Sequence, residues 1–289
     1  MTDVSACDYI EPIRLADNLI FFYWGRHPQH DNLDMQLGGG ACVIFSGTEA
    51  IVFDSMNLPG QGSWVRHYME SHHGIRKFIL VNSHCHEDHI AENHVYADCT
   101  LVAHEDTRRL MQQHRERLQQ GSPGVPGFPV VLADITFRGR LDLWCGTTKV
   151  ELHEFRIHEQ GHIAVYLPQQ KILLAADMLE DPLWIFHFDF AEAAVQIAEF
   201  ERMAAMDIEH IYPAHGDVET IRRGGYRKDF IQQTVTYLQR MMAAKDDPDF
   251  MQRDAQSFIA DFLQAGDLHW WEPYAQVHAA NCKTLQEMR

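Results

Sequence analysis

The chain has 289 residues, of which 46% are hydrophobic and 22% charged, a composition typical of a globular protein with a large core. Its formal net charge of −17 disfavours a nucleic-acid partner, because an acidic surface repels a phosphate backbone. No apolar run has membrane-spanning length, and residues 1–12 lack the pattern of a secretory signal. We therefore expect a cytoplasmic protein that binds neither nucleic acid nor membrane.

The six cysteines show no C-x-x-C spacing, so we expect reduced thiols rather than a disulfide framework or a zinc knuckle. Histidine is unusually frequent, with nineteen residues. The identity of the ligands among these histidines is therefore the main question that the composition raises.

The first half of the chain predicts short strands with two helices between them. Apolar segments rich in β-branched or aromatic residues favour strands at residues 19–24, 41–45, 50–54, 77–81 and 101–103. Helical spacing is present over 63–73 and 104–119. Gly121–Pro129 contains three prolines and three glycines and is expected to lack regular structure. It is either a plain surface connection or a loop that covers the substrate.

The second half repeats this mixture and ends in helices. Strands are predicted at residues 135–137, 150–155, 163–167, 172–175 and 208–212. Helices are predicted at residues 191–206, 220–244, 249–265 and 273–288. Two mixed halves packed sheet to sheet with helices outside would explain this order. We expect a catalytic domain over residues 1–220 and a helical extension over 221–289 packed on the same domain.

A dense group of potential metal ligands follows the predicted strand at 77–81. In the segment His84-Cys85-His86-Glu87-Asp88-His89, four residues of ligand type lie within six positions. Burying imidazole and carboxylate groups without partners is costly, and a metal ion supplies the partner. Imidazole suits zinc, iron or manganese, and a carboxylate can complete or bridge a second site. The segment therefore predicts a metal centre.

Further candidates lie at the ends of other predicted strands. His158, Asp177 and His215 each follow an apolar strand, and Asp54 ends the strand at 50–54. Several strand ends that deliver histidine or aspartate to one edge of a sheet would assemble a site on a rigid scaffold.

Together these motifs resemble the metallo-β-lactamase superfamily. Its H-x-H-x-D-H signature matches residues 84–89, and its first acidic motif matches Phe53-Asp54-Ser55. The later motifs match residues 158–162, Ala176-Asp177 and residues 213–217, and the order agrees over roughly residues 15–220. The resemblance implies an α+β fold, a four-layer αββα sandwich with the site at one edge of its two sheets.

The resemblance also implies a role for each ligand. One metal site would consist of His84, His86 and His158, and a second of Asp88, His89 and His215. Asp177 would bridge both. Asp54 would support the ligand loop by hydrogen bonds, and His162 would support rather than bind, although it could compete with His158.

The implied activity is hydrolysis by two divalent metal ions. We expect zinc, with iron or manganese as alternatives, and a bridging hydroxide that attacks a small-molecule ester, thioester or lactone. Asp88 would orient this nucleophile and move its proton. A homodimer is compatible with the resemblance.

The branch of the superfamily is less well defined by the sequence. The helical tail is similar to that of glyoxalase II thioesterases, whereas lactonases usually carry a tyrosine where Glu180 stands. A mononuclear iron dioxygenase that acts on persulfides and a non-catalytic metal-binding or sensor protein are the alternatives.

Two aromatic stretches could line a substrate pocket or pack the tail onto the core. The candidate pocket residues are Trp184, Phe186, His187, Trp270 and Trp271. His269 precedes the second stretch and shares this interpretation. Cys85 is expected to point away from the metals.

Overall fold

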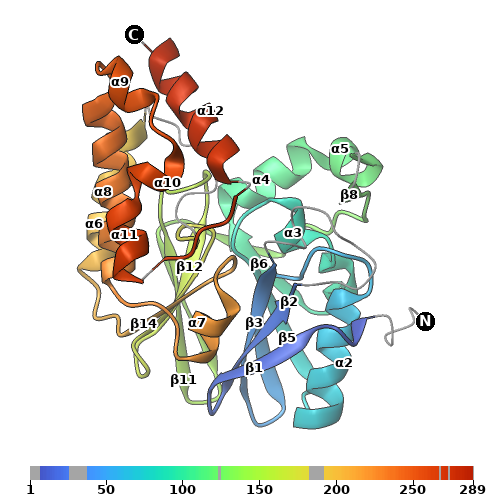
Figure 1. Ribbon diagram of the computed structural model, residues 1–289. Helices are drawn as coiled ribbons and strands as arrows, with labels where there is room; N and C mark the ends of the chain where they lie inside the picture. Colours follow the sequence, from blue (N-terminus) through green and yellow to red (C-terminus); the bar gives the residue numbers. More distant parts are fainter. Residues whose placement is uncertain are drawn as a thin grey trace.

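A computed structural model describes residues 7–25, 38–122, 125–181, 192–266, 268–272 and 274–288 (Figure 1). Within these ranges, no helix is long and apolar enough to cross a membrane.

The described residues form a first sheet of seven strands, in the order β1-β2-β3-β4-β5-β6-β9. The strands are β1 (Glu11–Ala16), β2 (Leu19–Trp24), β3 (Gly39–Ser46), β4 (Glu49–Phe53), β5 (Lys77–Asn82), β6 (Thr100–His104) and β9 (Ile135–Phe137). β1 to β4 pair antiparallel, whereas β4, β5, β6 and β9 are parallel. The carboxyl ends of β4 and β5 therefore meet at the same edge of the sheet.

A second sheet, with five strands in the described ranges, has the order β10-β11-β12-β13-β14. The strands are β10 (Arg140–Cys145), β11 (Thr148–Glu154), β12 (Ile163–Leu167), β13 (Ile172–Ala176) and β14 (His210–Pro213). β13 and β14 are parallel, so the residues that follow both strands lie at one edge.

The burial of β2 shows how the first sheet is covered on both faces. All six of its residues are buried. Leu19, Phe21 and Tyr23 join a central core with residues of the second sheet, whereas the alternate residues pack with helix α2 (Gln61–His73). Since successive side chains of a strand point to opposite faces, the first sheet lies between the second sheet and α2.

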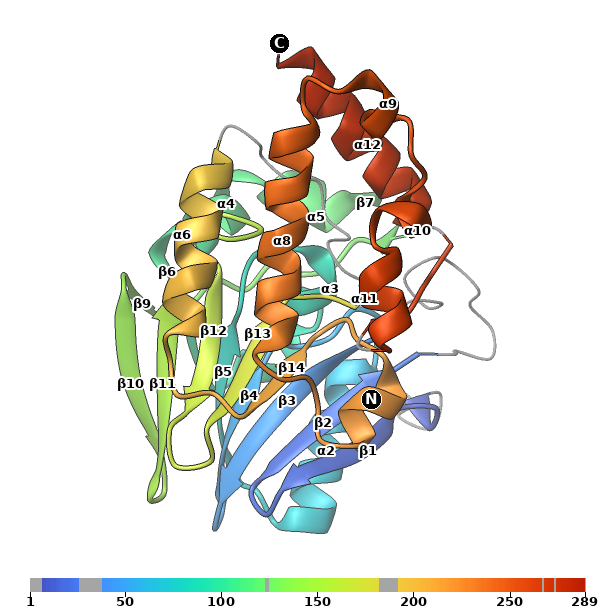
Figure 2. The ribbon, with the colours of Figure 1, turned by 60° about the vertical axis from the view of Figure 1, so that its left-hand side comes forward.

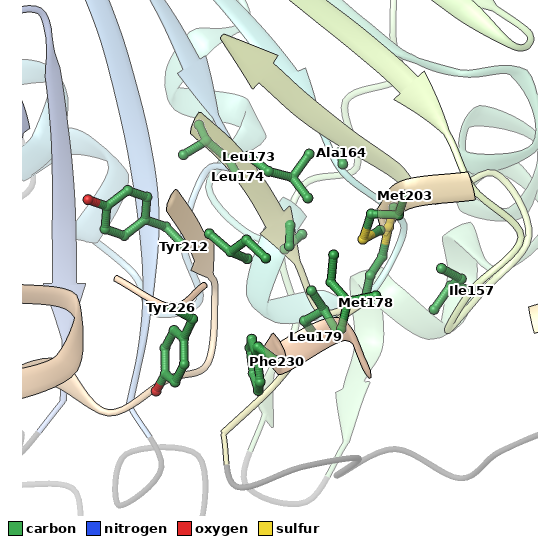
Figure 3. Close-up of a cluster of buried hydrophobic side chains, with 14 of the residues drawn as sticks. Ile157, Ala164, Leu173, Leu174, Met178, Leu179, Met203, Tyr212, Tyr226 and Phe230 are labelled. Atoms are coloured by element: carbon green, nitrogen blue, oxygen red, sulfur yellow. The ribbon is translucent and has the colours of Figure 1, made fainter. Parts of the chain in front are cut away.

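Helices α6 (Ala193–Ala204) and α8 (Asp229–Ala244) cover the outer face of the second sheet (Figure 2). Met203 of α6 lies beside Met178, and Phe230 of α8 lies beside Leu179, in the close-up of this layer (Figure 3). The layers are therefore helix, sheet, sheet and helix, and the predicted αββα sandwich is confirmed. The C-terminal helices end with α12 (Tyr274–Glu287), whose Leu285 is buried in the same core.

The remaining helices are shorter than the sequence predicted. Residues 104–119 form α4 (Glu105–Gln113) and α5 (Arg115–Gln120), and residues 220–244 form the end of α7 (Val218–Arg222) and then α8. The second break falls at Gly224-Gly225, which both have positive φ (109° and 74°), a conformation that ends a helix. Residues 249–265 form three short helices, α9 (Pro248–Met251), α10 (Ala255–Phe258) and α11 (Ala260–Ala265).

The expectation that Gly121–Pro129 has no regular structure was wrong in part. Its residues form a two-stranded hairpin of β7 (Gly121–Ser122) and β8 (Val125–Pro126). Phe128 is buried against Met111 and Leu118 of α4 and α5, so this end of the segment is held by packing.

Candidate metal centre

The loop that carries His84 and His86 is hydrogen-bonded to both sheets. It leaves β5 at Asn82 and enters the short helix α3 (Glu87–Ile90). The backbone N–H of Ser83 donates to Asp54 Oδ1 (2.7 Å), and Ile163 of the second sheet donates to the carbonyl of Ser83 (3.0 Å). These bonds fix where residues 84–89 leave the sheet edge.

Three residues at the strand ends have backbones in the left-handed region. Asp54, His158 and Ala176 have φ values of 68°, 60° and 47°. Such conformations in non-glycine residues cost about 1–3 kcal/mol each and persist where the surrounding structure enforces them. Asp54 follows β4 directly, Ala176 is the last residue of β13, and His158 lies in the loop after β11.

One set of converging side chains, the three-histidine group, consists of His84, His86, His158 and Asp177. Their candidate ligand atoms all lie within 4.8 Å of one another. His158 Nε2 is 3.1 Å from His86 Nδ1, and His84 Nε2 is 3.5 Å from Asp177 Oδ2. Two ring nitrogens at 3.1 Å are at the spacing of neighbouring ligands of one ion about 2 Å from each.

A second set, the two-carboxylate group, consists of Asp88, His89, Asp177 and His215. His215 Nε2 is 3.0 Å from Asp88 Oδ2, and His89 Nε2 is 3.1 Å from Asp177 Oδ2. Asp177 belongs to both groups. The structure therefore brings together the seven residues that the sequence singled out as ligands, in two sets that share one carboxylate.

The rings are oriented by bonds to their outer nitrogens. His89 Nδ1 is 2.8 Å from Asp54 Oδ2, and His215 Nδ1 is 2.8 Å from the carbonyl of Gly38. An Nδ1–H donated to these acceptors keeps Nε2 of each ring facing the centre, where it can bind an ion once it has lost its proton. At the neighbouring Gly39, a Cβ would lie 2.6 Å from the Trp24 ring and 3.0 Å from His215 Cε1, so the close approach requires glycine.

The surroundings shift the pKa values of two histidines in each group in opposite directions. Burial lowers the pKa of His84 well below its usual range, and burial together with the neighbouring His86 lowers the pKa of His158 to about 3. For His89, burial is outweighed by nearby carboxylates led by Asp177, which raise its pKa well above the usual value. The same balance raises the pKa of His215 to about 10.

Buried polar atoms indicate that a cation fits between the groups. His84 Nε2 and Asp177 Oδ1 are buried, and within the described residues no hydrogen bond reaches either atom. An imidazole nitrogen and a carboxylate oxygen left this way carry a desolvation cost that a divalent ion would remove. Both are ordinary zinc ligands.

His162 lies beside the three-histidine group without joining it. It is fully buried, and its ring stacks on His84 with centroids 4.3 Å apart. Cys85 donates its thiol to Glu159 Oε2 (3.1 Å) and packs in a separate apolar cluster. It therefore points away from the two groups, as its place in the motif predicted.

The aromatic candidates have different outcomes. Trp184, Phe186 and His187 lie outside the described residues. Trp270 packs partly buried against the central core and donates its ring N–H to Glu272 (2.8 Å), which fits packing of the tail. Trp271 is partly buried.

Two acidic residues just beyond Asp177, Glu180 and Asp181, were not predicted to be part of the site. Glu180 is buried, and burial together with the charge of Asp177 raises its pKa well above the usual value. Asp181 has a fully buried side chain that contacts the C-terminal extension. The only local signal was an acidic pair shortly after a strand end.

Comparison with known families agrees with this geometry. Residues 79–215 match the model of the metallo-beta-lactamase superfamily. A search of curated proteins finds no match. Similar solved structures include a metallo-beta-lactamase from Pontibacter korlensis, with a TM-score of 0.60 and 16% identity over 80% of this chain and 99% of that one.

Two further metallo-beta-lactamases are similar at the same level. The enzyme from Hirschia baltica has a TM-score of 0.60 and 14% identity over 79% of this chain and 97% of its own. FIM-1 from Pseudomonas aeruginosa, solved in a mono-zinc form, has a TM-score of 0.60 and 12% identity over 80% and 95%. Residues 79–215 of this chain therefore match the metallo-beta-lactamase superfamily, the chain is similar in fold to these enzymes over about 80% of its length, and two His/Asp groups suited to metal ions lie at its sheet edge.

Proposed function

We propose that this protein is a dinuclear metal-dependent hydrolase that acts on a small-molecule ester, thioester or lactone. The observation that carries the proposal is Asp177, whose Oδ2 lies 3.5 Å from His84 Nε2 and 3.1 Å from His89 Nε2. One carboxylate within reach of both groups can bridge two ions held side by side.

In this proposal, the three-histidine group holds one ion and the two-carboxylate group holds the other. Two divalent ions, zinc in our proposal, would supply Lewis acidity and lower the pKa of water to near neutrality. The chain itself fixes the ligand geometry through Asp54, Ser83 and the Gly38 carbonyl. This support keeps the imidazole nitrogens aimed at the centre before any substrate arrives.

Asp88 is the carboxylate best placed to handle protons. Its side chain is 24% exposed, against 5% for Asp177, so water and substrate can reach it. Burial opposes its ionisation, but the charge of His89 and the hydrogen bond from His215 hold its pKa well below the usual range. An ionised Asp88 can accept a proton from the attacking water and return it to the leaving group.

An acidic protein and an edge site favour a small neutral substrate. The net charge of −17 disfavours polyanions, and Glu180 adds a buried carboxyl near the ligands. The mononuclear iron dioxygenase alternative would use only the three-histidine group. The intact two-carboxylate group has no role in that reaction, and for this reason we prefer the hydrolase. A non-catalytic sensor would leave the accessible carboxylate of Asp88 without a function.

Elemental analysis of the purified protein, followed by assays with ester, thioester, lactone and phosphodiester substrates, tests this proposal. We expect about two zinc ions per chain and hydrolysis of an acyl substrate. One iron per chain with oxygen consumption would establish the dioxygenase instead. A protein that takes up no zinc, manganese or iron on reconstitution would contradict both enzymes.

A further inference from the structure

The carboxylate of Asp181 lies at the junction between the metal centre and the C-terminal extension. Its Oδ1 accepts from the backbone N–H of His269 (2.7 Å), and its Oδ2 lies 2.7 Å from His269 Nδ1. Oδ2 also accepts from the Tyr226 hydroxyl (2.6 Å). The side chain is fully buried, so these contacts replace the water that an ionised carboxylate would otherwise bind.

Asp181 is close in the chain and in space to two of the proposed ligands. It follows the bridging Asp177 by four residues, and its backbone N–H donates to the carbonyl of His215 (3.2 Å). The loop after β13 and the loop after β14 are therefore joined directly at Asp181. Any shift of Asp181 would move both loops, and both carry members of the two-carboxylate group.

Tyr226 closes the network on the other side. Its hydroxyl accepts from the backbone N–H of Asp217 (2.8 Å), two residues after His215. Its backbone pairs with Ile211 of β14 through two hydrogen bonds of 2.9 Å. His269 completes the ring, with Nε2 at 3.8 Å from Asp217 Oδ2. One side chain from the tail thus braces the ends of two strands.

We propose that His269 is a positioning residue for the two-carboxylate group, acting through Asp181 on the loops that carry Asp177 and His215. This inference rests on the proposed dinuclear function. Without the His269 ring, Asp181 would keep the Tyr226 contact but lose its neighbour at Oδ2. The buried carboxylate would then turn toward water or change its hydrogen bonds, and the loop from Asp177 to Asp181 would move with it.

A merely structural role for His269 is less consistent with its surroundings. The tail is already held by buried apolar side chains, among them Phe258, Phe262 and Leu285. The His269 side chain itself is 43% exposed, so its removal leaves no sealed cavity. The expected damage is therefore to ligand geometry and only slightly to folding.

The test measures metal binding by competition with a chromophoric chelator in wild type, His269→Ala and His269→Asn. Asparagine keeps a side-chain N–H near the position of Nδ1 and should restore the contact with Asp181. His153→Ala is the matched control, since His153 pairs with the carboxylate of Glu151 (2.9 Å) on β11, in a separate His–carboxylate contact. Thermal melting of the metal-free proteins reports any loss of folding.

We expect His269→Ala to bind the second ion about 10–100-fold more weakly, the range for loss of a supporting hydrogen bond around metal ligands. The first ion should bind as in wild type, His269→Asn should recover most of the affinity, and His153→Ala should not change it. If wild type binds two ions and His269→Ala binds them equally well, the inference is wrong and the proposed function stands. If wild type binds no second ion, the proposed function fails and the inference with it.

Discussion

The three-histidine group and the two-carboxylate group share Asp177 and use the same residue types, yet they hold protons differently. Burial and the charge of neighbouring histidines lower the pKa values of His84 and His158. Burial acts in the same direction on His89 and His215, but carboxylates led by Asp177 outweigh it and raise their pKa values. The number of carboxylates within reach decides the charge of a buried imidazole more than burial alone.

The difference has a consequence for loading. In the three-histidine group, the nitrogen lone pairs are already available to bind a cation. In the two-carboxylate group, the cation must first displace protons from the histidines. Once those protons have left, it is attracted by the negative charges of Asp88 and Asp177. The two groups are therefore expected to fill with different dependence on pH.

The largest expected effect comes from removing the shared carboxylate. Asp177→Ala should lose both ions and hydrolysis together, because neither group remains complete. Metal content should fall from about two per chain, the value for a dinuclear site, toward zero. Elemental analysis and the substrate assay measure this. The control is Asp207→Ala, an aspartate with a 75% exposed side chain that pairs with Lys171, which should keep both.

Replacing His158 or its neighbour His162 by alanine should affect the three-histidine group only. His158→Ala should lower metal content more than His162→Ala, because His158 Nε2 points at His86 Nδ1 (3.1 Å) whereas His162 stacks behind His84. His162→Ala should instead lower the melting temperature by leaving a cavity beside that ring. The reverse order of metal loss would exchange the roles of the two residues.

A smaller effect is expected from the support of His89. Asp54→Asn removes the charge that lies 2.8 Å from His89 Nδ1, and should weaken the ion in the two-carboxylate group about 10–100-fold. The ion in the three-histidine group should be retained. Chelator competition measures both ions, and Asp142→Asn on the exposed strand β10 is the control. Equal weakening of both ions would contradict the distinction between the groups.

The last prediction concerns the protons released on metal binding. The pKa of His215 is raised to about 10, so below that pH its proton must leave before the ring can bind a cation. Affinity in the two-carboxylate group should therefore rise with pH from 7 toward about 10. The pKa of His158 is about 3, so the three-histidine group should show no such rise.

Calorimetry in two buffers of different ionisation enthalpy measures this release. His86→Ala isolates the two-carboxylate group and Asp88→Ala isolates the three-histidine group. Proton release of similar size in the two variants would contradict the assigned charges.

Much of the fold could be predicted because its strands are short and strongly apolar. β2, β5, β12 and β13 are buried along most of their length and stand out in the sequence. β1 and β10 were not predicted, because they are edge strands in which exposed polar residues such as Arg14 and Asp142 interrupt the pattern. The helical prediction over residues 220–244 failed at Gly224, where a positive φ ends the helix, whereas the breaks at His114 and Ile259 have negative φ and carry no such signal.

The candidate ligands could be predicted for a different reason. Parallel strands bring their carboxyl ends to one edge of a sheet, so a histidine or aspartate directly after such a strand is expected at that edge. The contact between Asp181 and His269 could not be predicted in this way, because 88 residues separate them and neither has a local pattern. Such contacts depend on how the C-terminal helices pack, and the hydrophobic periodicity of the sequence does not predict this packing.

The hydrogen bond from Ile163 to Ser83 joins the two sheets where the ligands gather. His84 and His86 come from the first sheet, whereas His158, Asp177 and His215 come from the second. Bound ions would therefore act as cross-links between two halves of the sandwich. Ions present at 100 times their dissociation constant would add about 2.7 kcal/mol each to the free energy of unfolding. Removal of the metal ions should then lower the melting temperature, and the two sheets would separate first at the edge where the ligands lie.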